Sequence, residues 1–443
     1  MAHAAPAIDI SRENRRFDDI APGLAGRVWT LGVGAFVVAL LMALIPTFTG
    51  KQTDFSAGAS AFFRSYVLAF AYACSLGLGA LFFTMIQHLT RAGWSVVVRR
   101  FAETIAGQLP LLALLGLPLL IPIILGMEGV YEWSSAAAVK NDASGLLQKK
   151  APYLNATFFI GRMVFYFAVW GWLGSFYLNK SVEQDLTGDH ELSVKMGGVA
   201  GPGVLLYALT VTFFAVDLLM SLTPHWYSTI FGVYYFAGCM VSTHATLIVM
   251  MVLLQRSGRL TNVLTQEHYQ DVGKFMFAFT VFWAYIGFSQ YMLIWYANLP
   301  EETYWYAARQ STPYWLVVSL TLLFGHFVLP FLALISKHAK RSPNFIFLGA
   351  CWMLLMHFVD MHYVVSPDTH GYQQYLLAKD AGKAAAGAGS YMAHGATALL
   401  TDIPMTIGML AVLASAVIRE LGRNSLIPER DPRLSESLAF ENI

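Results

Sequence analysis

Charge is scarce in this chain. Only 12% of its 443 residues are Asp, Glu, Lys or Arg, whereas 56% are hydrophobic. Soluble domains usually carry roughly 25% charged residues, about twice as many. The net charge of +1 creates no strong field of either sign, so nucleic acid is not an expected partner. The composition therefore predicts an integral membrane protein, and its charges have to be interpreted by position.

Cysteine is also scarce. Cys74, Cys239 and Cys351 lie far apart inside apolar runs, with no CxxC, CxxCH or Cys/His metal spacing. This pattern does not support a covalently bound haem, an iron–sulfur cluster or another metal site. Short strands and glycine-rich phosphate loops are absent, and the longest connections, 127–155 and 365–396, are too short for a soluble domain of any size. An all-α membrane bundle is the remaining architecture.

Long apolar runs, by contrast, are frequent. A hydrocarbon core about 30 Å thick requires about 20 helical residues. The first run is too long for a signal-peptide core and lacks a clear cleavage site, so we expect it to be retained. The sequence predicts an all-α integral membrane protein with about ten transmembrane helices at 28–48, 65–87, 101–126, 156–178, 200–222, 229–255, 275–297, 314–336, 344–364 and 397–418.

The basic residues alternate between the two sides of these spans. Nineteen of the 28 Lys and Arg residues lie on the side that includes both terminal segments, eight lie on the other side, and Arg162 lies within a span. Basic residues favour the cytoplasmic side. The bias predicts a cytoplasmic N-terminal segment (1–27), a transmembrane domain (28–418) and a cytoplasmic tail (419–443). The opposite ends of the spans are rich in aromatic residues, which predict an interfacial belt that includes Trp226, Tyr227, Trp295, Tyr296, Trp305 and Trp315.

Ionisable side chains inside the spans are the candidate functional groups. Such groups are costly in lipid and usually face a bundle interior or a wet cavity. The predicted orientation puts most of the acids in the outer half of the membrane and Glu103 in the inner half. The candidates for a proton pathway are Asp217, Asp360, His357, Asp402, Glu103, His326, His244 and Arg162.

His357 and Asp360 are three residues apart and share a helix face. This spacing suits a proton relay or a hydrogen-bonded site for a quinone headgroup. Alternatively, Asp360 orients His357 or pairs with a neighbouring helix. The sequence leaves these interpretations open.

Asp217 and Arg162 are candidates for the same bundle interior. Asp217 shares a polar stripe with Ser221, so a proton site and an ion pair with Arg162 both remain open. Arg162 forms one face with Tyr166 and Trp170, and it lies near enough to the outer end of its span to snorkel towards water.

Glu103 and Asp402 each have a structural alternative. Glu103 follows Arg99 by four residues, which fits an intrahelical ion pair at the interface. Asp402 precedes Pro404 by two, where a loosened helix could hold water beside it. The alternative for Asp402 is a helix-end cap.

A haem ligated by two histidines would need paired residues on facing helices. His244, His326 and His357 are available, but no helix shows a repeated histidine pair. Hydrogen bonding or proton transfer is the favoured role of these side chains.

Three blocks carry a family resemblance: DLLMSLTPHWYSTIFGVYYFAG (217–238), EHYQDVGKFMFAFTVFWAYIGFSQYMLIWYANLPEETYWYAAR (267–309) and, more weakly, QHLTRAGWSVVVRRFAE (87–103). They resemble the F subunit of Alternative Complex III, a bacterial quinol:acceptor oxidoreductase, and the related NrfD/PsrC-like membrane subunits. The resemblance implies two four-helix bundles, at about 65–222 and 229–364, with flanking helices.

The resemblance also implies partners in the bacterial inner membrane. These are a sister NrfD-like membrane subunit, an iron–sulfur subunit, multihaem cytochrome c subunits, small membrane subunits and, as a further partner, a terminal oxidase. Haem and iron–sulfur clusters are expected only on the partners. The sister subunit is expected to oxidise quinol, because the second span here (66–90) lacks the glycine-and-histidine pattern associated with that role.

The implied function is that of a respiratory membrane subunit that is not catalytic alone and supplies a proton pathway or structural support. One alternative is a quinone-binding redox subunit in its own right, with His357 and Asp360 at a quinone or lipid site. A proton-coupled transporter is another, although Pro202, Pro330 and Pro404 form no obvious inverted pair. A pure scaffold, in which buried charges pin helices together, is the third.

Overall fold

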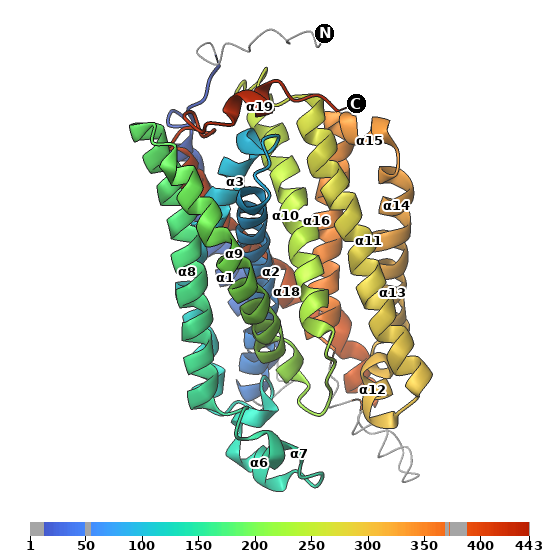
Figure 1. Cartoon of the computed structure of the whole chain (residues 1–443). Coiled ribbons are helices and arrows are strands. Elements are labelled where there is room, and N and C mark those ends of the chain that lie inside the picture. The colour runs from blue at the N-terminus through green and yellow to red at the C-terminus, as the bar shows by residue number, and fades with distance from the viewer. Residues whose placement is uncertain (1–12, 49–54, 368–371, 373–387, 443) are drawn as a thin grey trace.

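The spans form one bundle of helices that run side by side (Figure 1). The computed structural model describes residues 13–48, 55–367, 372 and 388–442, and these residues form helices without strands. Within them, ten helical spans are long and apolar enough to cross a membrane, which confirms the predicted fold class. The long elements are α1 (Ala21–Phe48), α2 (Phe55–Leu89), α8 (Ala156–Thr187), α9 (Glu191–Leu218), α10 (Phe231–Arg256), α11 (Gln266–Ala297), α16 (Pro343–Val365) and α18 (Ala388–Leu421).

Several helices extend beyond the predicted spans because the ends of the helices are set by caps and not by the edge of the apolar run. The start of α8 follows Asn155, whose side chain accepts the N–H of Phe158 at 2.9 Å. The same helix ends at Gly188, where φ is +71°. Glycine adopts this left-handed conformation without the steric cost of a Cβ atom.

Two spans are interrupted. The third consists of α3 (Val96–Ala106), α4 (Leu109–Gly116), η2 (Leu117–Leu119) and α5 (Leu120–Ile124). The eighth consists of α13 (Pro313–Thr321), the π-helical η5 (Leu322–Val328) and α14 (Leu329–Leu334). Pro330 has no N–H to donate to the carbonyl of His326 four residues earlier, which gives a local reason for the wider turn.

The second span, α2, is the most enclosed part of the bundle. It packs against α3, α9, α10, α16 and α18. Its closest approach is to α10, because a Cβ atom on Gly79 would lie 2.2 Å from Thr243 Oγ1 and 2.3 Å from the carbonyl oxygen of Cys239. Only glycine permits this separation, a use of small residues that is typical of membrane helix contacts.

The two ends of the bundle differ. The N-terminal segment and the C-terminal tail meet at one end, where Leu426 N–H donates to the carbonyl of Arg15 and Arg15 pairs with Glu429 at 2.9 Å (Figure 1). We call this the terminal end. The other end, the loop end, carries the short helices α6 (Ala136–Asn141), α7 (Leu146–Lys150) and α12 (Pro300–Ala308).

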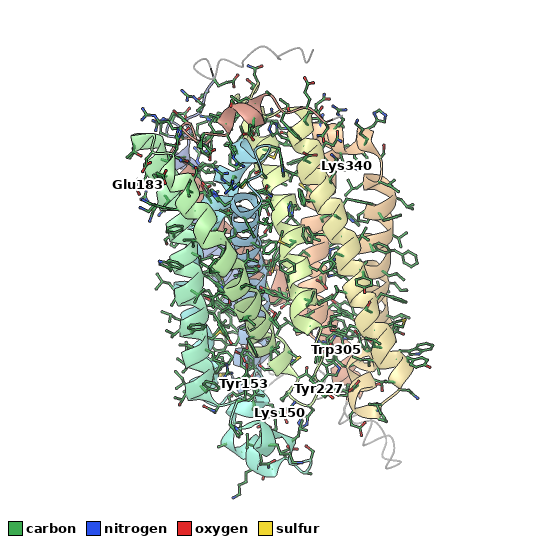
Figure 2. All side chains as sticks on the ribbon, viewed as in Figure 1. Lys150, Tyr153, Glu183, Tyr227, Trp305 and Lys340 are labelled. Atoms are coloured by element: carbon green, nitrogen blue, oxygen red, sulfur yellow. The ribbon has the colours of Figure 1, made fainter. Side chains whose placement is uncertain are left out.

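The predicted aromatic belt is only partly correct. Tyr227 and Tyr296 are exposed at the loop end, as an interfacial belt requires. Trp226, Trp305 and Trp315 are buried, and Trp226 stacks on Trp305 with ring centroids 4.5 Å apart. Figure 2 shows Tyr227 and Trp305 at this end of the molecule. The buried rings pack the connections against the bundle and do not anchor it to headgroups.

Candidate functional site

Buried polar side chains gather at three levels along α2. Ser65, Ser75 and His88 each contribute to a different cluster and all three are buried. At 1.5 Å per residue, Ser65 and Ser75 are about 15 Å apart along the helix, and Ser75 and His88 about 20 Å. The three levels together span a distance similar to a hydrocarbon core of about 30 Å. We call them the loop-end, middle and terminal clusters.

The loop-end cluster centres on Asp402 of α18. Its carboxylate accepts hydrogen bonds from Ser65 of α2 and, at 2.8 Å, from Ser366. His362 Nδ1 of α16 lies 2.7 Å from Asp402 Oδ2, and the other ring nitrogen, Nε2, lies 2.7 Å from the hydroxyl of Tyr314. The imidazole thus lies between a carboxylate and a phenol, both within proton-transfer distance.

This cluster corrects one prediction and adds one residue. Asp402 lies well inside α18, which begins at Ala388, so the helix-end cap is wrong. His362 is absent from the predicted candidates, although it lies inside a predicted span and is only 2% exposed. The criterion that selected the other candidates, an ionisable side chain inside a predicted span, applies to His362 as well. Its partner Asp402 lies on a different helix, so the pair leaves no spacing signal in the sequence.

The middle cluster contains Asp360, and its carboxylate accepts only from neutral donors. The hydroxyl of Tyr234 donates to Oδ1, and the indole N–H of Trp283 donates to Oδ2 at 3.1 Å. The residue is fully buried. No described side chain forms an ion pair with it, which distinguishes it from the other buried acids of the bundle.

His357 belongs to the same level but does not bond to Asp360. Its Nε2 lies 2.8 Å from the hydroxyl of Ser75, which in turn lies 3.3 Å from the hydroxyl of Ser242. Tyr72 packs edge-on against the imidazole with centroids 4.8 Å apart. The shared helix face was predicted correctly, but the two residues bond to different neighbouring helices. His357 Nδ1 has no hydrogen-bond partner among the described residues.

The other two histidines among the predicted candidates, His326 and His244, lie in different surroundings. His326 lies in the π-helical η5, with its ring centroid 3.9 Å from that of Trp283, and neither ring nitrogen is hydrogen-bonded among the described residues. His244 bonds to the carbonyl of Met240 in its own helix at 2.6 Å and stacks on Phe275 and Phe279. Aromatic packing around His244 favours a structural role.

Arg162 and Asp217 form a buried ion pair. Arg162 Nε donates to Asp217 Oδ2 at 2.8 Å and its NH2 to Oδ1 at 2.9 Å, and the hydroxyl of Tyr166 donates to Oδ2 at 2.9 Å. The guanidinium lies over the rings of Tyr153 and Phe158. Of the two interpretations left open, the ion pair is the observed one. Arg162 does not snorkel, since it is only 9% exposed.

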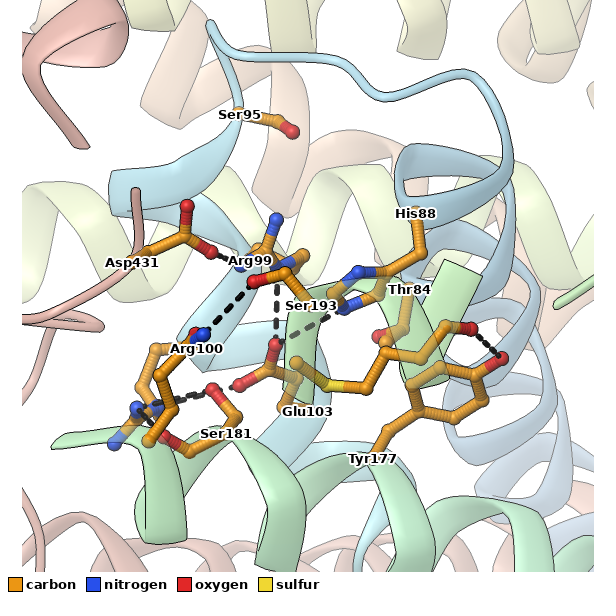
Figure 3. A network of polar contacts seen from close by, with 12 residues as sticks. Thr84, His88, Ser95, Arg99, Arg100, Glu103, Tyr177, Ser181, Ser193 and Asp431 are labelled. Atoms are coloured by element: carbon orange, nitrogen blue, oxygen red, sulfur yellow. Dashed lines mark hydrogen bonds and ion pairs between the residues drawn. The ribbon is translucent and has the colours of Figure 1, made fainter. Parts of the chain in front are cut away.

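The terminal cluster surrounds Glu103 of α3 (Figure 3). Arg99 Nε donates to Glu103 Oε1 at 3.0 Å, and Arg100 Nε donates to Oε2 at 3.2 Å. His88 Nε2 of α2 lies 3.8 Å from Oε1. The predicted pair with Arg99 exists, and Glu103 is fully buried. Asp431 of the C-terminal tail completes the cluster by accepting from Arg99.

Outside the spans, one loop-end contact carries a perturbed group. His225 Nε2 lies 3.6 Å from Glu132 Oε1, and both side chains are about one-fifth exposed. The nearby Glu132 carboxylate raises the pKa of His225 above its ordinary value, despite the opposing effect of burial. Nearby, Lys150 donates to the carbonyl of Pro224 at 2.6 Å, and burial lowers the pKa of its ammonium group.

The fold and these clusters define a multi-pass α-helical membrane protein with titratable groups buried at several depths. A comparison with protein-family models finds no match, and a comparison with curated protein sequences finds no significant match. No group of three or more histidine, cysteine or acidic side chains suited to a metal ion occurs among the described residues.

Proposed function

We propose that this chain is a membrane subunit of a bacterial respiratory quinol:cytochrome c or quinol:oxidase oxidoreductase complex, to which it contributes a proton pathway. The resemblance of 217–238 and 267–309 to the Alternative Complex III subunit supports the class of complex. The basic bias assigns the terminal end to the cytoplasm. Quinol oxidation takes place in the sister subunit, and electrons do not pass through this chain.

The observation that carries the proposal is the distribution of polar groups along α2. The loop-end and middle clusters lie about 15 Å apart and share α2 and α16, whereas about 20 Å separate the middle cluster from the terminal one. In that longer interval Thr84 bonds to the carbonyl of Ala80 in its own helix, and Gly79 brings α10 into direct contact. Two half-paths separated by a closely packed segment are what a coupled proton pathway requires, because a continuous one would leak.

The chemistry of the half-path that contains the loop-end and middle clusters follows from its donors and acceptors. At the loop end, His362 can accept a proton from Tyr314 on one ring nitrogen while the other faces Asp402. In the middle cluster, Asp360 has no cationic partner among the described residues, so it can change its protonation state without breaking an ion pair. Asp217 and Arg162, by contrast, are assigned to structural support.

The test measures protons moved per electron in the purified complex, reconstituted in vesicles with a pH-sensitive dye inside. We expect D402N and D360N each to reduce this ratio while the complex still assembles and oxidises quinol. E301Q, at the exposed Glu301 of α12, is the matched control and should leave the ratio unchanged. An unaltered ratio in both buried variants would contradict the proposal.

A quinone-binding subunit is the second candidate, and one observation favours it. His357 Nδ1 and both nitrogens of His326 have no partner among the described residues, so they can bind a carbonyl oxygen. Against this role, the carboxylate of Asp360 already accepts from two side chains. Labelling of the complex by a photoreactive quinone at α16 or η5, reduced in H357F but not in H244F, would support this alternative.

A further inference from the structure

The terminal cluster has an imbalance of charge. Arg99 and Arg100 face three carboxylates, those of Glu103, Asp185 and Asp431, through ion pairs at the ends of α3, α8 and the C-terminal tail. Two positive charges against three negative ones leave these ion pairs with an excess of one negative charge, and the guanidinium groups of Arg430 and Arg433 bind backbone carbonyls nearby instead of these carboxylates. Arg99, Arg100 and Glu103 are each at most 3% exposed. Burying a net charge is costly, and the protonation of one neighbouring group would remove it.

The arginines also divide their hydrogen bonds in an unusual way. Glu103 receives only the Nε–H of each arginine, at 3.0 and 3.2 Å. Arg99 Nη2 donates a hydrogen bond to Asp431. Arg100 Nη2 donates to Asp185 at 2.7 Å and to Ser181 Oγ at 3.0 Å. Neither guanidinium forms a fork with Glu103, although such bidentate pairs are the strongest geometry available to arginine. Glu103 therefore keeps capacity to accept a further hydrogen bond.

His88 is placed to supply that hydrogen bond. Its Nε2 lies 3.8 Å from Glu103 Oε1 and has no hydrogen-bond partner among the described residues, and its side chain is 5% exposed. The ring stacks on Tyr177 of α8 with centroids 5.3 Å apart (Figure 3). The separation of 3.8 Å exceeds a hydrogen bond, so the ring has to move closer to donate to the carboxylate. Of the common side chains, imidazole is the one that changes charge near neutral pH.

The surroundings of His88 contain few other charges. From α3 it faces Arg99 and Glu103, with Arg100 beyond Glu103, and from the tail Asp431. From α8 it faces Tyr177, with Asp185 behind Arg100. The nearest charged residues of α9 and of the loop after α2 are exposed to water, which screens them: Arg91, Glu191 and Lys195.

We propose that the terminal cluster is a loading site for a single proton, that His88 is the residue that accepts it, and that Asp431 of the C-terminal tail supplies the charge that holds it. The inference rests on the proposed function, because it names the entry residue of the cytoplasmic half-path. The proton comes from water at the terminal end, forms the second N–H bond of the imidazole, and makes the cluster neutral. On release the same N–H bond breaks, water takes the proton, and His88 returns to the neutral form.

The tail holds Asp431 in place by contacts that the rest of the chain provides. Its short helix α19 (Leu434–Leu438) lies against α3, and Ser437 donates to the carbonyl of Trp94 at 2.7 Å. Arg433 N–H donates to Asp431 Oδ1 at 2.8 Å, which orients the carboxylate towards Arg99. Asp431 is therefore a positioning residue that acts through Arg99 and through its charge.

The test is nitrogen-15 NMR of histidine-labelled full-length protein in lipid bilayers, with the His88 signal assigned by its loss in H88Q. It requires neither partners nor turnover. We expect His88 to change from neutral to cationic as the pH falls from about 8 to 4. D431N should lower the ratio of protonated to neutral His88 about tenfold at a given pH, the effect of one pK unit. D431E, which keeps the charge, should retain the wild-type ratio.

The matched control is E429Q, which removes an acid from the same tail but from the pair with Arg15 outside the cluster. It should leave the ratio within about twofold of wild type, since a screened surface charge has little effect. A His88 ring that stays neutral throughout, or an equal effect of D431N and E429Q, overturns the proposal. If His88 titrates as expected while D402N and D360N leave protons per electron unchanged, the proposed function fails and the loading site stands.

Discussion

Removal of the Asp217 carboxylate provides the sharpest test of the distinction between structural and proton-carrying acids. Asp217 is fully buried and accepts hydrogen bonds from two nitrogens of the Arg162 guanidinium. D217N therefore leaves Arg162, which is only 9% exposed, without its anion. Breaking a buried ion pair from one side usually costs about 3–5 kcal/mol. In this variant Arg162 still has its hydrogen bond to the carbonyl of Tyr153, at 3.0 Å, and its contacts with the rings of Tyr153 and Phe158. We therefore expect a loss near the lower limit, about 3 kcal/mol.

The assay is denaturant unfolding of the full-length protein in mixed micelles, followed by tryptophan fluorescence. The double variant R162M/D217L leaves no charge buried, so it should lose less unfolding free energy than D217N alone. D360N should lose less than D217N, since Asp360 accepts only from neutral donors. The reasoning is refuted if D217N stays within about 1 kcal/mol of wild type, or if the double variant is no more stable than the single one.

Three further perturbations have defined outcomes. Because the Glu132 carboxylate raises the pKa of His225, that contact stabilises the fold below about pH 6.5, and the stabilisation is lost as pH rises through the folded-state pKa of His225. H225Q should therefore lower the melting temperature at pH 5.5 and leave it unchanged at pH 9, with a loss of about 0.5–1 kcal/mol at low pH. G79A pushes α2 away from the α10 backbone and should lower the free energy of unfolding by about 1–3 kcal/mol or more. In the control G34A nothing lies within 4 Å of the new Cβ atom, so the loss should be small. Equal melting temperatures of the two variants would contradict this reasoning. R309M leaves three backbone carbonyls without their charged donor and should lower the free energy of unfolding by at least about 3 kcal/mol in the same denaturant assay.

The spans were predictable because each is a continuous apolar run, and that signal depends on no other part of the chain. Their ends were less so. Polar turns continue α8 as far as Thr187 and start α9 at Glu191, since helical hydrogen bonds do not stop where the apolar residues do. The breaks in the third and eighth spans follow from prolines that the sequence shows, but their effect on backbone geometry depends on the surrounding helices.

The candidate site was predictable residue by residue but not in its pairing. Burial of an ionisable group selects Asp360, Asp402 and Glu103 from the sequence, since few charges interrupt the spans. Which groups meet is decided by how helices pack, so the contact of His362 with Asp402 has no local signature. Asp431 was missed for a different reason. It lies in a polar tail, where an acid is ordinary, and only the folded structure buries it against Arg99.

The place of Asp431 in the chain has a consequence for biogenesis. Arg99 and Asp431 are separated by 332 residues, so the arginine enters the membrane long before Asp431 is made. At about 5–20 residues per second, synthesis of the intervening chain takes roughly 20–60 s. During that time Arg99 and Arg100 share the single carboxylate of Glu103 in their own span, until Asp185 of α8 follows. A ribosome that stops before residue 431 releases a protein with every span present and this cluster unfinished, a state that is open to membrane quality control.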